Sequence, residues 1–242
     1  MHAIEIKNLT KKYKDVVAVD NLCLNVADGE LFSLLGVNGA GKTTTIKMLC
    51  GLTAPTDGDA FLNSKSIITD TTAVKKIIAI SPQETAVASG LTVQENLDLI
   101  CGIYGFSKDI KNKKITELTS LLGLENVINK KAGKLSGGYQ RKLSIAMALI
   151  CEPKILFLDE PTLGLDVLAR SDLWGIIRSL KGKITIILTT HYMEEAETLS
   201  DRIAIMKDGK MLVCDTAQNI KEMAQKDNFE QAFISIVKGE VK

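Results

Sequence analysis

The sequence predicts an α/β fold in which a mainly parallel sheet is combined with an N-terminal antiparallel β subdomain and an inserted α-helical subdomain. Three observations lead to this fold class. Several short apolar runs rich in β-branched residues are typical of buried parallel strands. A glycine-rich loop joins one of these runs to a helical segment. A stretch without proline and with helical spacing, about 84–150, interrupts the series of strands.

The N-terminal part carries two segments in which apolar and polar residues alternate. These segments are residues 2–9 and 17–26, and the second ends at the turn Ala-Asp-Gly of 27–29. Alternation is typical of strands that bury one face, so we expect the two segments to pair as antiparallel strands. They form the predicted antiparallel β subdomain.

Four apolar runs supply the predicted parallel sheet, and they lie at 31–35, 77–81, 155–159 and 184–190. The first run leads into the loop GVNGAGKTT of 36–44 and then into the helical segment TTTIKMLCGL. This order of strand, glycine loop and helix is the structural context that a phosphate-binding loop requires. Further along the chain, Asp208-Gly209 within 206–213 predicts a hairpin.

The stretch of about 84–150 has helical rather than strand-like spacing. Helices are indicated in VQENLDLICGIYG, in KKITELTSLLGL and in the segment 134–149, whose predicted apolar face is Leu143, Ala146, Met147 and Ile150. After the last strands, 229–237 reads as an amphipathic closing segment. Because repeats and linkers are missing from the sequence, we expect one domain over 1–242, with the helical subdomain inserted in its core.

Composition narrows the class of protein. A chain of 242 residues, 45% apolar and 24% charged, is typical of a soluble globular protein. The net charge of +1 argues against a general nucleic-acid binder, because such proteins usually carry an excess of basic residues. No run of about 18 apolar residues occurs, and the first residues lack the apolar core of a signal peptide, so we expect a cytoplasmic location. The odd and widely spaced cysteines are expected to be reduced core thiols: Cys23, Cys50, Cys101, Cys151 and Cys214.

The loop after the first apolar run matches the phosphate-binding pattern G-x-x-x-x-G-K-[ST] at 36–43. Its glycines let backbone N–H groups surround phosphates, Lys42 reaches the β and γ oxygens, and the Thr43 hydroxyl can ligate Mg²⁺. The match indicates a P-loop NTPase core. The predicted nucleotide-binding residues of this loop are Gly36, Asn38, Gly39, Ala40, Gly41, Lys42, Thr43 and Thr44.

Two acidic residues end the apolar run ILFLDEP of 155–161. Asp159 would lie at the carboxyl end of its strand, close to the glycine loop, where it can hold Mg²⁺ directly or through water. Glu160 beside it could orient and deprotonate an attacking water. Acids at a strand end are often helix caps, but the glycine loop favours the metal and catalytic interpretation.

A second phosphate-type signature lies about a hundred residues beyond the first. Ser136, Gly137 and Gly138 precede a predicted helix, where free backbone N–H groups and the positive end of the helix dipole favour an anion. One nucleotide does not need two such signatures within one chain. The sequence therefore raises the question of which phosphate the second one serves.

The glycine loop, LSGG and LDEP, in this order, resemble the ATP-binding subunit of an ABC transporter over nearly the whole chain. The resemblance implies an ATPase that uses ATP and Mg²⁺. It implies that Gln83 contacts Mg²⁺ and the attacking water and senses a membrane partner, and that His191 contacts the γ-phosphate. It also implies that Tyr13 stacks on adenine and that Asp166 lies in a loop crossing to a partner subunit.

In that family, two subunits pack head to tail, and the LSGG helix of one closes over the nucleotide held by the other. The resemblance therefore implies a dimer with a second ATP-binding subunit, either an identical chain or a paralogue. Ser136, Gly137 and Gly138 would then contact the partner's nucleotide.

The segments 135–210 and 90–105 resemble bacterial ABC-2 exporters and the related lipid exporters. Departures from the broad family pattern are Tyr139, where glutamine often stands, and GLD at 164–166, where importers commonly have ALD. The resemblance implies an ATP-hydrolysing subunit that powers export through a separate transmembrane permease. The chain would then be peripheral on the inner face of the cell membrane, without a nucleic-acid partner.

The alternative function is a soluble ABC ATPase without a membrane partner, for example one in iron–sulfur cluster assembly. Members that repair DNA or organise chromosomes insert long coiled coils between the glutamine and the signature. Only about fifty residues separate Gln83 from Leu135 here, which leaves no room for such an insertion.

Overall fold

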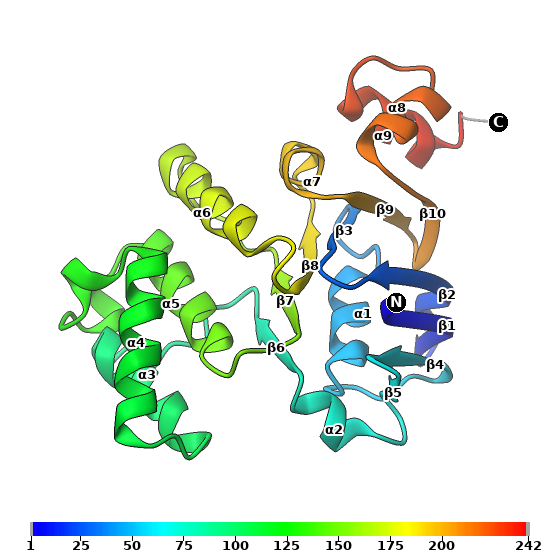
Figure 1. Ribbon diagram of the computed structural model, residues 1–242. Helices are drawn as coiled ribbons and strands as arrows, with labels where there is room; N and C mark the ends of the chain where they lie inside the picture. The colour runs from blue at the N-terminus through cyan, green and yellow to red at the C-terminus, as the bar shows by residue number, and fades with distance from the viewer. Residues whose placement is uncertain (1, 241–242) are drawn as a thin grey trace.

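The computed structural model describes residues 2–240 and contains two sheets with helices around them (Figure 1). The antiparallel sheet has the strand order β2-β1-β4-β5, and the larger sheet has the order β10-β9-β3-β8-β7-β6. The strands of the antiparallel sheet are β1 (His2–Tyr13), β2 (Val16–Ala27), β4 (Asp57–Leu62) and β5 (Lys65–Ser66). Those of the larger sheet are β3 (Leu31–Gly36), β6 (Ile78–Ser81), β7 (Ile155–Asp159), β8 (Thr185–Thr190), β9 (Arg202–Lys207) and β10 (Lys210–Asp215). This arrangement confirms the predicted fold class.

The larger sheet is parallel except at one edge. Strand β3 pairs in parallel with β8 and β9, and β7 pairs in parallel with β6 and β8. Only β10 is antiparallel to its neighbour β9, to which the predicted turn at Asp208-Gly209 joins it. The carboxyl ends of β3, β6, β7 and β8 consequently meet at one edge, which is where ligands bind in sheets of this type.

The inner strands of the larger sheet, β3, β7, β8 and β9, are buried on both faces. Along β7, Ile155 and Phe157 pack with the antiparallel sheet and helix α1 (Lys42–Leu49), whereas Leu156 and Leu158 pack with α5 (Gly137–Leu149) and α6 (Val167–Leu180). Two covered faces explain why these strands read as continuous apolar runs rather than alternating ones.

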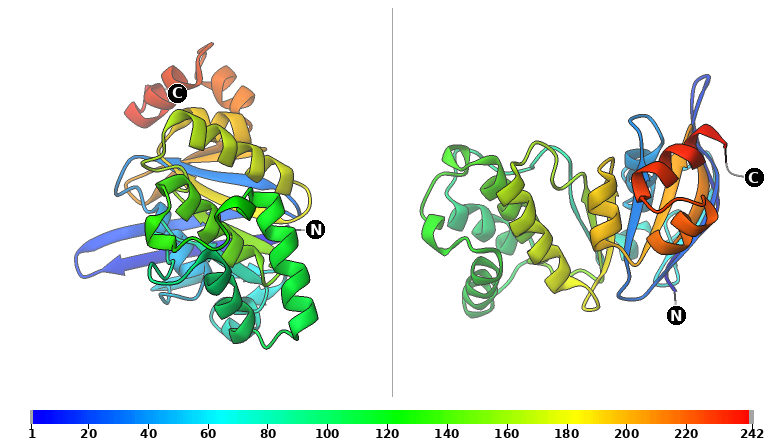
Figure 2. Two further views of the ribbon diagram at one scale, coloured as in Figure 1. Left: turned by 90° about the vertical axis from the view of Figure 1, so that its left-hand side faces the viewer. Right: turned by 90° about the horizontal axis from the view of Figure 1, so that it is seen from above.

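The helical insertion lies beyond the β6 edge, on the side away from the antiparallel sheet (Figures 1 and 2). It contains α3 (Val93–Ile103), α4 (Lys108–Leu122) and α5 (Gly137–Leu149), with the short 3₁₀ turns η1 (Glu125–Val127) and η2 (Ala132–Lys134) between the last two. The first part of the predicted stretch, 84–92, holds no helix. Helix α3 starts only after a capping box of Thr92 and Glu95, which satisfies N–H groups at its first turn.

Five further helices complete the described part of the chain: α2 (Thr71–Lys75), α6 (Val167–Leu180), α7 (Met193–Leu199), α8 (Ala217–Met223) and α9 (Phe229–Lys238). The last two share an apolar cluster with α7 and β9, to which α9 contributes Phe229 and Phe233. The predicted amphipathic closing segment is therefore α9. Within 2–240, no helix combines the length and the apolar content needed to cross a membrane.

All five cysteines are free thiols in the structure, as the sequence predicts. Cys50 and Cys101 are buried, but Cys23 is exposed on β2, where its thiol donates to the Asn8 side chain. The expectation of a core thiol is therefore wrong at Cys23. The apolar residues around it face the other side of the strand, because side chains alternate along β2.

Candidate active site

A cavity of about 670 Å³ opens at the carboxyl edge of the larger sheet. Several residues predicted from the sequence line it, namely Tyr13, loop residues 38–44, Gln83 and Glu160. Four lining residues were not predicted: Val16, Val17, Ala18 and Asp208. They come from the β1–β2 hairpin and the β9–β10 turn, which approach the glycine loop only in the folded chain.

The glycine loop runs from the end of β3 into α1 and lies against β2. Gly41 has a φ of 101°, which favours glycine, and a Cβ at this position would collide with the carbonyl oxygen of Ala18. The amide of Thr45 donates to the Gly41 carbonyl, so α1 starts directly after the loop. The N-terminus of α1 therefore faces the cavity, as phosphate binding requires.

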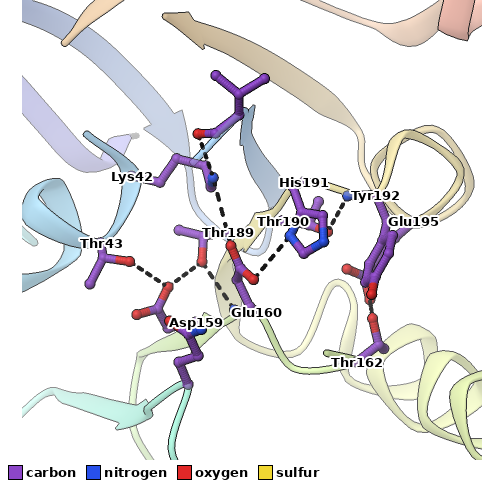
Figure 3. A network of polar contacts seen from close by, with 12 residues as sticks. Lys42, Thr43, Asp159, Glu160, Thr162, Thr189, Thr190, His191, Tyr192 and Glu195 are labelled. Atoms are coloured by element: carbon purple, nitrogen blue, oxygen red, sulfur yellow. Dashed lines mark hydrogen bonds and ion pairs between the residues drawn. The ribbon is translucent and has the colours of Figure 1, made fainter. Parts of the chain in front are cut away.

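Lys42 is buried below the loop. Its Nζ donates to the carbonyl oxygens of Gly36 at 2.7 Å and Val37 at 3.2 Å. The same Nζ lies 3.7 Å from Oε1 of Glu160 (Figure 3). Burial lowers the pKa of Lys42, while the charges of Glu160 and Asp159 act in the opposite direction. The ammonium thus lies at the base of the cavity with a carboxylate as its partner.

Asp159, at the end of β7, accepts hydrogen bonds from two threonines. Oγ1 of Thr43 lies 3.2 Å from Oδ1 of Asp159, and the hydroxyl of Thr189 donates to the same oxygen. The glycine loop and the strand β7 therefore meet at this carboxylate, as the sequence predicts. No cluster of three or more His, Cys, Asp or Glu side chains with metal-binding geometry occurs within 2–240.

Glu160 follows in a strained conformation with a φ of 47°. Its amide donates to both the carbonyl oxygen and the Oγ1 of Thr189, each at 3.1 Å. These bonds fix the backbone so that the carboxylate points toward Lys42 and His191 (Figure 3). Nδ1 of His191 lies 3.0 Å from Oε2 of Glu160.

The second phosphate-type signature does not line the cavity. Ser136 is the N-cap of α5, and Gly137 and Gly138 form the first turn of that helix in the helical insertion. A Cβ on Gly138 would lie 3.0 Å from the Cβ of Ala169 on α6, so glycine also permits the close approach of α5 and α6.

Tyr13 and Asp166, to which the resemblance also assigns roles, contact residues close to them in the sequence. Tyr13 ends β1 with its ring half-exposed, and the Lys11 ammonium lies 5.0 Å from the ring centre. Asp166 is the N-cap of α6, where its carboxylate accepts from the amide of Ala169 at 2.9 Å.

Sequence reasoning missed a buried carboxyl behind His191. Glu195 on α7 accepts from Oγ1 of Thr162 at 2.8 Å (Figure 3). It also accepts from Nε1 of Trp174 at 3.0 Å. Burial raises the pKa of Glu195, while hydrogen bonds from Thr190, Thr162 and Trp174 lower it. Nothing in HYMEEAE distinguishes Glu195 from its acidic neighbours except that it falls on the apolar face of the helix, with Leu199 one turn later.

Comparison with known proteins gives one family. The family described as ABC transporter matches residues 19–163. The probable multidrug ABC transporter ATP-binding protein YbhF of Escherichia coli strain K12 is 38% identical over 97% of this chain and 41% of its own length. The human phospholipid-transporting ATPase ABCA3 is 41% identical over 90% of this chain and 13% of its own length. The chain thus spans less than half the length of these curated relatives.

Solved structures agree with the sequence comparisons. An ATP-binding subunit of an ABC transporter superposes with a TM-score of 0.86 at 28% identity, covering 97% of this chain and 99% of that one. The ATP-binding cassette MJ0796, solved as a dimer in a post-hydrolysis state with ADP and phosphate, gives a TM-score of 0.79 at 29% identity, covering 88% and 98%. From its motifs, its fold and a family match over more than half its length, this chain belongs to the ABC transporter family, as one of its ATP-binding ABC ATPase chains.

Proposed function

We propose that ATP binds with its phosphates in the glycine loop 38–44 and its adenine against Tyr13. The cavity of about 670 Å³ extends from one to the other, and its volume is in the range of small-molecule sites. Lys42 would exchange part of its contact with Glu160 for the β and γ oxygens, because a phosphate carries more negative charge than a carboxylate.

The oxygens of Asp159 and Thr43 fit a magnesium ion. Mg²⁺ is held by one or two carboxylates together with phosphate oxygens and water, so a cage of many acidic side chains is not needed. Asp159 and Thr43, joined by their 3.2 Å hydrogen bond, are the residues that would hold it, with Gln83 at the cavity wall as a further ligand. When bound, the ion neutralises charge on the phosphates.

Glu160 is the proposed general base. Water attacks the γ-phosphorus, Glu160 accepts a proton from it, and the bond from phosphorus to the β–γ bridging oxygen breaks to give ADP and phosphate. Such a transfer depends mainly on positioning and charge stabilisation. Two contacts position Glu160, one at each carboxylate oxygen: Lys42 at 3.7 Å and His191 at 3.0 Å. His191 is partly exposed, so it can also contact the γ-phosphate.

The signature Ser136-Gly137-Gly138 serves the nucleotide of a second ATP-binding subunit in this proposal. Its place at the N-terminus of α5 suits a phosphate, yet it lies outside the chain's own cavity. The dimeric structure of MJ0796 supports a pair of subunits, which pack head to tail in this proposal. ATP then closes two composite sites, each built from one glycine loop and one signature.

The chain is further proposed to be a single ABC ATPase domain that drives export through a separate transmembrane permease. The names of the relatives, a multidrug transporter protein and a phospholipid-transporting ATPase, support a transport role. An apolar groove of about 510 Å³ supports a contact with the permease. It lies between β6, α3 and α5 and is lined by Leu52 and by Pro82, the neighbour of Gln83. A permease helix in this groove would hold the chain at the inner face of the membrane.

Co-purification with the permease tests the transport proposal. The tagged full chain is expressed in its native cell, recovered from detergent-solubilised membranes and reconstituted in proteoliposomes with any integral membrane protein that it retains. The proposal expects one such protein, which changes the rate of ATP hydrolysis by the chain. Recovery with soluble assembly factors alone, and no membrane protein that changes hydrolysis, contradicts it.

A matched pair of variants tests the groove itself. Leu52→Glu places a charge in the groove lining, whereas Ile68→Glu places one on a comparably exposed apolar residue outside it. We expect Leu52→Glu to lose the membrane protein and Ile68→Glu to retain it. Equal retention by both variants would show that the groove is not the contact.

A further inference from the structure

Arg141 on α5 binds the chain segment that carries Gln83. Its side chain is buried, and the two terminal nitrogens of the guanidinium donate to consecutive carbonyl oxygens. Nη1 donates to Pro82 and Nη2 donates to Gln83, each at 2.6 Å. A planar guanidinium holds two acceptors in a fixed relative position, which an ammonium does not do.

A second contact one turn along α5 strengthens this attachment. Oγ of Ser144 and Oγ of Ser81 lie 2.8 Å apart in a buried position. Arg141 and Ser144 are three residues apart and therefore share one face of the helix. Together they hold three successive residues, 81–83, as the chain leaves β6 and enters the cavity wall at Gln83.

The arginine is costly at this place. Burial lowers the pKa of Arg141, and the charges of Asp159 and Glu195 only partly offset this effect. Removing a cation from water disfavours folding unless it is fully hydrogen-bonded, and an apolar side chain would fill the same volume at lower cost. The two hydrogen bonds to carbonyl oxygens hold the Gln83 backbone in a fixed position relative to α5, which an apolar residue would not do.

Helix α5 begins with the signature. Ser136 and Arg141 are five residues apart, which is about 7.5 Å along a helix. A displacement of the Gln83 backbone is therefore passed through the guanidinium to a rigid element that carries Ser136, Gly137 and Gly138. In the proposed function, Gln83 contacts the nucleotide of its own chain, whereas the signature contacts the nucleotide of the partner.

We propose that Arg141 is a positioning residue that links Gln83, at the nucleotide of its own chain, to the signature that covers the nucleotide of the partner. The inference rests on the proposed function of Gln83 and of the signature. It assigns to Arg141 two effects: the placement of Gln83 for hydrolysis, and communication between the two composite sites.

Arg141→Lys in the full chain is the first test. Lysine retains the charge and fits the space, but it loses the paired contact to both carbonyl oxygens. We expect kcat to fall about 10- to 100-fold, as displacements of about 1 Å do, while KM for ATP stays within about twofold. The Hill coefficient for ATP should fall towards one, because coupling between sites is lost. Arg178→Lys, at an exposed position on α6, is the control and should match the parent in all three quantities.

A double-mutant cycle with Gln83→Ala separates positioning from a general structural effect. If Arg141 acts through the Gln83 side chain, Arg141→Lys causes little further loss of kcat once that side chain is absent. Full additivity of the two losses, or an Arg141→Lys variant with the parent's kcat and Hill coefficient, would overturn the inference.

Ser144→Ala keeps the inference testable if Arg141→Lys does not fold. It removes only the hydroxyl contact with Ser81, and a smaller loss of kcat, again absent in the Gln83→Ala background, is expected. An unchanged kcat, or a loss that persists in that background, counts against the inference. A parent chain that does not hydrolyse ATP would instead contradict the proposed function, so the two failures are distinct.

Discussion

Nδ1 of His191 lies 3.0 Å from Oε2 of Glu160, and Oε1 of the same carboxylate lies 3.7 Å from Nζ of Lys42. The carboxylate is thus held from two sides by residues of different elements, His191 directly after β8 and Lys42 at the start of α1. This arrangement fixes the direction in which Glu160 can accept a proton. In the proposed reaction, His191 therefore orients the base in addition to its proposed contact with the γ-phosphate.

His191→Ala should therefore remove turnover without removing the nucleotide. We expect kcat for ATP hydrolysis to fall about 100-fold, the lower range for the loss of a positioned proton-transfer group. Binding of a fluorescent ATP analogue should stay within about twofold of the parent, since the glycine loop is intact. Hydrolysis at the parental rate would show that Glu160 needs no orientation by His191.

Ser136→Arg should separate dimer closure from ATP binding. An arginine at the N-terminus of α5 fills the space needed for the partner's phosphates, while the chain's own cavity is unaffected. We expect loss of the ATP-dependent dimer in size-exclusion chromatography and normal binding of ATP by the monomer. Lys42→Ala should instead weaken the binding of ATP by the monomer itself.

Ser107→Arg is the matched control for this experiment. Ser107 is also an extended N-cap in the helical insertion, at the start of α4, and its side chain makes no cap bond either among the described residues. It should dimerise like the parent. If Ser107→Arg and Ser136→Arg lose the dimer equally, the signature has no special role in closure.

Glu195 should make folding stability depend on pH. Its pKa is raised from 4.5, mainly by burial. Above pH 4.5 the unfolded chain releases this proton first, so the free energy of unfolding falls as pH rises until the folded carboxyl also ionises. Glu195→Gln keeps an acceptor for Thr162 and Trp174 without this titration. The stability of the variant relative to the parent should therefore increase from pH 5 to 8.

Urea unfolding, followed by the fluorescence of the chain's one tryptophan, measures this difference. A constant difference across that pH range would contradict a raised pKa. Glu195→Ala supplies a reference, because it leaves the buried hydroxyl of Thr162 and the partly buried indole N–H of Trp174 without an acceptor and should cost about 1–3 kcal/mol.

Much of the fold could be predicted because local patterns and buried strands coincide. The runs 155–159 and 184–190 became β7 and β8 almost residue for residue, since both faces of these strands are covered. Strands β4 and β5 could not be predicted in the same way. Strand β4 contains Asp57, Gly58 and Asp59, which are rare in strands, and β5 has only two residues. Their register comes from the pairing of β4 with β1 and of β5 with β4 rather than from their own sequence.

The candidate site also contains some features that the sequence predicts and others that only the folded chain shows. Loop 36–44 and the pair Asp159 and Glu160 carry sequence patterns that specify their chemistry, and the structure brings them together. Contacts between distant segments carry no such pattern. The two bonds from Arg141 to the Gln83 segment and the burial of Glu195 depend on how α5, β6 and α7 pack, so only the folded chain shows them.

The central claim is that Glu160 is the base of a composite site which closes around ATP. Glu160→Gln retains the size of the side chain but cannot accept the proton. The decisive measurement is single-turnover hydrolysis of bound ATP by this variant, combined with its molar mass in solution. The account predicts almost no hydrolysis, ATP retained and a stable dimer. A Glu160→Gln chain that hydrolyses ATP at the parental rate, or remains a monomer with ATP bound, would contradict it.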